Sequence, residues 1–188
     1  MSTTSASLVT RAEKLSVDVL WRFAPVVDRE RRFPTESIEA LREAGLFRFM
    51  VPERFGGVGG SYQEYTQIAA ALGEGCLSTA IIWAMHCQQT VTLAEHGGDE
   101  HAAALASIAE KGVLCASVLT EVETGGDHMS AAAALVPEGE GFRVQRHCPT
   151  VSYGEASGLF LMTMRAGRES PEDDIRLVLV SRDDATIT

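Results

Sequence analysis

The spacing of apolar residues along the chain changes near Gly112. Before that residue, apolar side chains recur every three or four positions, as on one face of an amphipathic helix. After it they come in short runs or alternate with polar residues, which is typical of strands. The pattern predicts an α+β protein, with a helical domain over residues 1–112 and a β-rich domain over residues 113–188.

Five helices are predicted in the first part. They cover about Ser7 to Arg29, Pro34 to Ala44, the segment after Ser61 to Gly75, Thr79 to His96, and the segment after Asp99 to Lys111. Pro25 is expected to kink the first helix or end it early. Ser61 and Glu64 have the spacing of a capping box, and Ser78 is a candidate cap for the fourth helix.

The predicted helix Thr79 to His96 is apolar nearly all round, so we expect it to be buried on several sides. His86 lies in its middle, where a hydrogen-bonded histidine of the core or of a pocket wall is expected more than a catalytic one. The preceding glycine-rich stretch, Phe47 to Gly60, lacks the Gly-Lys-Ser/Thr of a phosphate-binding loop. It is interpreted as a tight connection between helices.

Four strand regions are predicted in the second part. They are Val113 to Leu119, a hairpin of Ala131 to Pro137 and Phe142 to Gln145 around a turn at 138–141, Leu159 to Met164, and Ile175 to Val180. The first strand is followed by a hydroxyl, a carboxylate and paired glycines, from Thr120 to Asp127. These residues suit a surface turn, and they also suit a ligand site built from backbone N–H groups and a hydroxyl.

Charge and composition exclude several classes of protein. The chain has 26 acidic and 16 basic residues, a formal charge of −10, and no clustered basic face, so binding to nucleic acid or to an anionic membrane is not expected. No apolar stretch approaches the roughly 20 residues needed to span a bilayer, and no secretory signal is recognised. We expect a cytoplasmic protein.

The cysteines and histidines show no metal-binding pattern. Cys76, Cys87, Cys115 and Cys148 are scattered, without a Cys-x-x-Cys pair. We expect reduced, mostly buried thiols and no metal site.

Residues 120–127, Thr-Glu-Val-Glu-Thr-Gly-Gly-Asp, resemble the Thr-Glu-Pro-x-x-Gly-Ser-Asp signature of the acyl-CoA dehydrogenase family. The Pro-Glu-x-x-Gly-Gly-x-Gly stretch that begins at Pro52 is a second motif similar to that family. The resemblance follows the order of the whole chain. It implies an N-terminal all-α domain and part of an antiparallel, barrel-like β middle domain.

The resemblance also implies an FAD site. Leu119 and Thr120 would meet the flavin pyrimidine, with Gly125 and Gly126 beside them, and Thr150, Val151 and Ser152 would lie against the other side of the ring. Ser117 and Gly126 would contact the substrate. The chain departs from the family at Val122, Gly126, Cys148 and Thr150, where proline, serine, lysine and an aromatic residue are usual.

The implied activity is the oxidation of an acyl-CoA by FAD, with acyl-CoA or a related small molecule as substrate. The family's C-terminal helical domain, which carries the catalytic base, is not found in these 188 residues. We therefore expect the chain alone to be inactive on acyl-CoA. We also expect it to form a homo-oligomer or a complex with a chain that supplies the missing half. Two alternatives stay open: a flavin-dependent monooxygenase on the same fold, and a non-catalytic truncated subunit.

Overall fold

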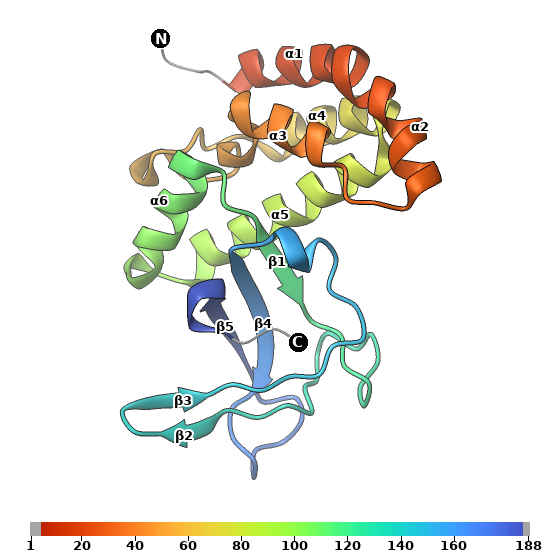
Figure 1. Cartoon of the computed structure of the whole chain (residues 1–188). Coiled ribbons are helices and arrows are strands. Elements are labelled where there is room, and N and C mark those ends of the chain that lie inside the picture. The colour runs from red at the N-terminus through yellow and green to blue at the C-terminus, as the bar shows by residue number, and fades with distance from the viewer. Residues whose placement is uncertain (1–4, 186–188) are drawn as a thin grey trace. The chain divides into compact units, whose positions relative to one another are not determined.

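The computed structural model describes residues 5–185 and divides the chain into two compact units, Met1–Cys115 and Ala116–Thr188 (Figure 1). The first unit is helical. The second carries a three-stranded and a two-stranded sheet, with no closed barrel among the described strands. The predicted α+β class is confirmed.

The first predicted helix, about Ser7 to Arg29, is found as one continuous helical segment. It consists of α1 (Ser5–Leu15), a wide π-helical turn (Ser16–Leu20) and α2 (Trp21–Glu30). Pro25 lies inside α2, where it removes one backbone donor; of the two expected effects, a kink or an early end, the early end is not seen. The helix ends at Arg31, whose left-handed backbone (φ 52°) lets its N–H bond to the Asp28 carbonyl.

Four further helices match the predicted ones within a few residues. They are α3 (Thr35–Glu43), α4 (Tyr62–Gly75), α5 (Leu77–His96) and α6 (Ala102–Lys111). The Ser61 hydroxyl accepts from the Glu64 N–H, and the Glu64 carboxylate accepts from the Ser61 N–H, so the predicted capping box is confirmed. Ser78 is not a cap, because α5 already begins at Leu77.

Two side chains of α5 hold the segment that follows α3. The Trp83 indole N–H donates to the Leu46 carbonyl at 3.0 Å. The Nδ1 atom of His86 accepts from the backbone N–H of Cys115 at 3.1 Å, so its Nε2 carries the proton and donates to the Phe47 carbonyl, also at 3.1 Å. Both side chains are fully buried. The interpretation of His86 as a hydrogen-bonded core histidine is confirmed.

The glycines between α3 and α4 allow the backbone of this loop to pack closely against its own residues. A Cβ on Gly57 would lie 1.8 Å from the Val51 carbonyl oxygen, and one on Gly60 would lie 2.1 Å from the Phe49 ring. Gly56 and Gly59 have positive φ angles of 85° and 62°. These contacts support the interpretation of this stretch as a tight interhelix loop.

The second unit is built around β4 (Leu159–Arg165), which lies between β1 (Cys115–Val118) and β5 (Ile175–Ser181). Strands β4 and β5 pair in antiparallel fashion, with Leu159 opposite Ser181. Both strands cover the predicted segments. The burial of β4 on nearly every residue makes it the core strand of this unit.

The predicted hairpin is shorter in the structure. Strand β2 spans Val136–Glu138, β3 spans Gly141–Arg143, and the turn between them has two residues, Gly139 and Glu140. The segment 131–135, predicted as part of the first strand, bonds elsewhere. The Ala131 N–H donates to the Glu172 carbonyl, and the Leu135 N–H donates to the Arg165 carbonyl. These bonds draw the segment away from the hairpin ladder.

Gly75 allows the end of α4 to touch the π-helical turn. A Cβ at this position would lie 2.6 Å from the Ser16 carbonyl oxygen and 2.8 Å from the Leu20 Cβ. We expect Gly75→Ala to lower the free energy of unfolding by about 1–3 kcal/mol, because rigid backbone occupies the space. Gly73→Ala is the matched control: its nearest neighbour outside α4 is 4.0 Å away, and it should stabilise by about 0.5–1 kcal/mol. Equal denaturant midpoints for the two variants would contradict this account.

The burial of His86 makes stability depend on pH. The pKa of His86 is lowered from 6.5 to about 4, mainly by burial; the hydrogen bond to Phe47 raises it, and the nearby Arg42 charge lowers it. The unfolded chain therefore takes up a proton below pH 6.5 that the folded chain does not. The free energy of unfolding is therefore highest above pH 6.5. It falls by about 3 kcal/mol in all as the pH is lowered toward 4.

Denaturant unfolding of the wild type and of His86→Gln from about pH 7.5 to about pH 5 measures this effect. Gln keeps a donor and an acceptor but does not titrate. We expect the variant to be less stable at the higher pH and its unfolding free energy to fall less steeply with acid. Parallel pH profiles for the two proteins would show that His86 does not carry the effect.

Candidate functional site

The predicted site residues all lie in or beside the second unit's core sheet. Ser117 is in β1, Leu119 and Thr120 directly follow it, and Gly125 and Gly126 are in the next turn. The segment from Thr150 to Ser152 lies between β3 and β4. The roles of these residues toward a flavin stay predictions.

A hydrophobic cluster joins the two predicted flavin-facing segments. Ala116 and Val118 of β1 and Phe160 of β4 form its buried part. Cys148 and Val151, which belong to the second of these segments (residues 148–152), pack against the same cluster. Residues about 30 positions apart in the sequence are therefore brought to one patch of core, as a site formed by both segments requires.

The hydroxyl groups of the predicted site make no hydrogen bond to the described residues. Ser117 and Thr120 are half-buried, and Thr150 and Ser152 are exposed. A Cβ on Gly126 would meet nothing within 4 Å. These groups are free to bind a ligand, since the protein itself does not use them.

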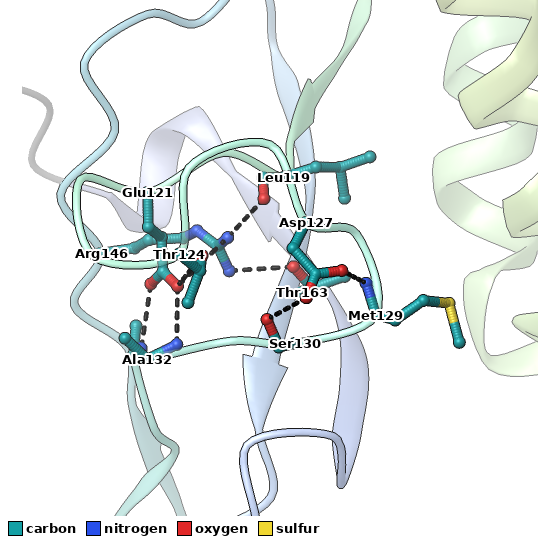
Figure 2. A network of polar contacts seen from close by, with 10 residues as sticks. Leu119, Glu121, Thr124, Asp127, Met129, Ser130, Ala132, Arg146 and Thr163 are labelled. Atoms are coloured by element: carbon teal, nitrogen blue, oxygen red, sulfur yellow. Dashed lines mark hydrogen bonds and ion pairs between the residues drawn. The ribbon is translucent and has the colours of Figure 1, made fainter.

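Glu121, the carboxylate of the signature, bonds to other groups of the protein (Figure 2). Glu121 accepts from the backbone N–H groups of Ala132 and Ala133 at 2.7 and 2.9 Å, and its carboxylate lies 3.6 Å from a guanidinium nitrogen of Arg146. The two side chains are 1% and 2% exposed. At that burial an unpaired charge would be strongly unfavourable, so the pair and its hydrogen bonds are interdependent.

Arg146 connects this carboxylate to the end of β1 (Figure 2). It donates from Nη2 to the Leu119 carbonyl at 2.8 Å and from Nη1 to the Thr163 hydroxyl of β4 at 3.0 Å. The Leu119 carbonyl is therefore occupied, which leaves Thr120 and the neighbouring backbone to face a ligand. Sequence reasoning missed Arg146; a lone basic residue just after a predicted hairpin, with Glu121 needing a partner, was the available signal.

Hydrogen bonds within the signature fix the turn that carries the glycines. Glu121 and Gly125 exchange backbone N–H to carbonyl bonds at 3.2 and 2.9 Å, with Gly125 at a φ of 61°. The Asp127 carboxylate accepts from the Met129 N–H and the Ser130 hydroxyl, both at 2.9 Å. The bond from Met129 and then that from Ser130 lower the pKa of Asp127. The turn is thus held from both ends.

The segment after Ser152 is held by Arg182, which follows β5. Its guanidinium donates to the carbonyls of Ser157 and Gly154 and lies over the Phe160 ring, 5.3 Å from the centroid. Tyr153 has a positive φ of 45°, which is uncommon for a residue with a side chain. The backbone just after Ser152 is therefore held by the Arg182 side chain.

Other kinds of site are not found in residues 5–185. No group of three or more metal-ligating side chains is present among them, and none of their helices is long and apolar enough to cross a bilayer. Of the four cysteines, three are buried, and burial raises the pKa of Cys87. A cavity of about 420 Å³ lies on the second unit, and none of the predicted flavin-facing residues lines it.

Comparison with known proteins gives acyl-CoA dehydrogenases among the relatives. Bovine (Bos taurus) mitochondrial short-chain specific acyl-CoA dehydrogenase is 34% identical over 67 residues, which is 36% of this chain and 16% of that protein. The butyryl-CoA dehydrogenase of Megasphaera elsdenii superposes with a TM-score of 0.83 at 16% identity, over 97% of this chain and 49% of that one.

Two further solved structures share the fold. PigA in complex with FAD and proline has a TM-score of 0.80 at 17% identity, over 97% of this chain and 49% of that chain. The HsaA monooxygenase of M. tuberculosis has a TM-score of 0.78 at 18% identity, over 96% of this chain and 44% of that chain. The chain spans about half the length of these solved proteins.

A family model supplies the decisive comparison. The model of the acyl-CoA dehydrogenase N-terminal domain matches residues 4–106, more than half of the 188 residues. Together with the agreement of fold over nearly the whole chain, this match shows that the protein belongs to the acyl-CoA dehydrogenase family.

Proposed function

We propose that this chain binds FAD through the ends of β1 and of the 148–152 segment, as part of a flavoprotein oxidoreductase. The observation that carries the proposal is the packing of both segments on one hydrophobic cluster, with the hydroxyls of Thr120 and Ser152 unused by the described protein. Family membership and the fold shared with PigA, whose structure contains FAD, support the same cofactor.

The residues present fit a flavin in part. Two hydroxyls and an open glycine turn offer hydrogen bonds to a heteroaromatic edge, and Val151 offers an apolar contact. Thr150 stands where the family has an aromatic side chain, so a stacking contact worth about 1 kcal/mol is missing. We therefore expect FAD to bind, with lower affinity than a site that keeps the aromatic residue.

The proposed reaction is oxidation of the CH–CH bond of an acyl-CoA. Bound FAD would supply the hydride acceptor for such a reaction. Donors from this chain near the flavin pyrimidine would stabilise negative charge on it, and Thr120 is the candidate. No residue of the chain is assigned as the catalytic base, so binding rather than turnover is the direct test of these residues. Cytoplasmic location and association with a second copy or a completing chain stay predictions.

A flavin-dependent monooxygenase is the second candidate. The specific observation in its favour is the fold shared with the HsaA monooxygenase. Anaerobic mixing of an acyl-CoA with the FAD-loaded protein, together with a chain that supplies the catalytic base, separates the two. Reduction of the flavin by the thioester supports a dehydrogenase. A flavin that stays oxidised until an external reductant is added, and then reacts with oxygen and an aromatic substrate, supports a monooxygenase.

The FAD site is tested by binding to the purified chain. We expect Thr120→Val and Ser152→Ala each to weaken FAD binding about two- to twelvefold, the effect of one hydrogen bond of about 0.5–1.5 kcal/mol. Fluorescence of FAD during titration with protein measures this. The matched controls are Thr66→Val on α4 and Ser107→Ala on α6, whose hydroxyls bond within their own helices. They should leave FAD affinity unchanged.

Two results would overturn the assignment. One is the absence of saturable FAD binding by the folded wild-type chain. The other is an equal change in affinity for the site variants and the helix controls. Either result would show that the hydroxyls of Thr120 and Ser152 are ordinary strand-end groups without a role in FAD binding.

The buried pair is tested by stability. We expect Arg146→Met to lower the free energy of unfolding by about 3–5 kcal/mol, because Glu121 loses its counter-charge and the Leu119 carbonyl loses its donor. Arg176→Met removes an exposed pair with Asp174, and its effect should stay within about 1 kcal/mol. In the Arg146→Met background, Glu121→Gln should cost less than in the wild type. Additive losses would show that the two residues act independently.

A further inference from the structure

The arginines of the second unit fall into two groups. Residues 116–188 contain six arginines and no lysine. Three of them, Arg146, Arg176 and Arg182, bond to protein acceptors as described above. The side chains of the other three make no hydrogen bond or ion pair with the described residues. All three, Arg143, Arg165 and Arg168, line the cavity of about 420 Å³.

The strands of the unit build this cavity. Arg143 ends β3 and Gln145 follows two residues later, so both side chains lie on the same side of that segment. Ala132 and Ala134 alternate in the same way on the segment that runs beside the end of β4. Their small side chains leave space beside the larger residues that also line the cavity, Arg143, Gln145, Arg165 and Arg168.

Of the three arginines, Arg165 has the backbone that is held most firmly by hydrogen bonds. It is the last residue of β4, its N–H donates to the Ala133 carbonyl at 2.7 Å, and its carbonyl accepts from the Leu135 N–H at 2.9 Å. Its Nε is buried and has no hydrogen-bond partner in the described protein. A buried guanidinium N–H without an acceptor is unfavourable, and a ligand oxygen would satisfy it.

The charge of the cavity is opposite to that of the chain. The formal net charge is −10, yet no carboxylate lines this cavity and three guanidinium groups do. An anion that lies between them would lower the repulsion between these charges. A guanidinium binds two oxygens of one anion at a time, and three of them match the several oxygens and the double charge of a phosphoryl group better than a single carboxylate.

We propose that this cavity binds a phosphoryl group of a small phosphate-bearing molecule, with Arg165 as its central ligand and Arg143 and Arg168 beside it. The volume lies within the range of small-molecule pockets, so part of an organic group fits beside the phosphate. None of the residues assigned to FAD lines the cavity. The proposal is independent of the flavin site and of the proposed reaction.

Calorimetric titration of the purified chain with inorganic pyrophosphate, at constant ionic strength, tests the proposal. We expect saturable binding to one site. Arg165→Gln should weaken it tenfold or more, and Arg143→Gln, at an exposed hairpin position, several-fold. Arg176→Gln changes the net charge equally but lies outside the cavity, and it should alter affinity less than about twofold. Circular dichroism confirms that each variant is folded.

A second series adds coenzyme A as a competitor. If coenzyme A displaces pyrophosphate, the site is assigned to the phosphates of an acyl-CoA. If it does not, the site is assigned to another phosphate ester. Both results retain the phosphoryl site. The proposal is overturned if the folded wild type shows no saturable binding, or if Arg176→Gln weakens binding as much as Arg165→Gln, since only net charge would then matter.

Discussion

The second unit depends on a single buried ion pair. Glu121 and Arg146 are almost completely enclosed, and together they connect four separate segments: the end of β1, the turn after it, the segment at 132–133 and β4. Because a buried charge is costly without its partner, the contacts of these segments stabilise one another. The backbone that would face a flavin is fixed by this pair rather than by the flavin-facing side chains.

The helical unit uses the same principle with neutral groups. Helix α5 is apolar on most sides, and its polar atoms at Trp83 and His86 are used to hold the chain segments that pass over it. A buried donor or acceptor must find a partner, so each such atom specifies one position for a backbone group. The connection from α3 and the entry to β1 are both located in this way.

The positions at which the chain departs from the family differ from the positions that hold the turn. Val122 is exposed and Gly126 meets open space, so neither position carries a contact of the turn. Cys148 packs on the hydrophobic cluster, where a thiol behaves as a small apolar group. The residues that hold the turn, Glu121, Gly125 and Asp127, are those that match the family. The positions that hold the turn therefore match the family signature, and the positions that depart from it do not hold the turn.

Local patterns in the sequence were sufficient for the class of fold and for most elements. Apolar spacing located the helices and the long strands, and Ser61 with Glu64 marked the start of α4, because these signals come from residues within one or two turns of each other. The family signature likewise lies within eight consecutive residues. Tertiary structure alone decided that segment 131–135 leaves the hairpin and that Arg146 is the partner of Glu121. It also gathered Arg143, Arg165 and Arg168 around one cavity. Each of these depends on residues far apart in the chain, and their free energies of burial and pairing exist only once the chain has folded.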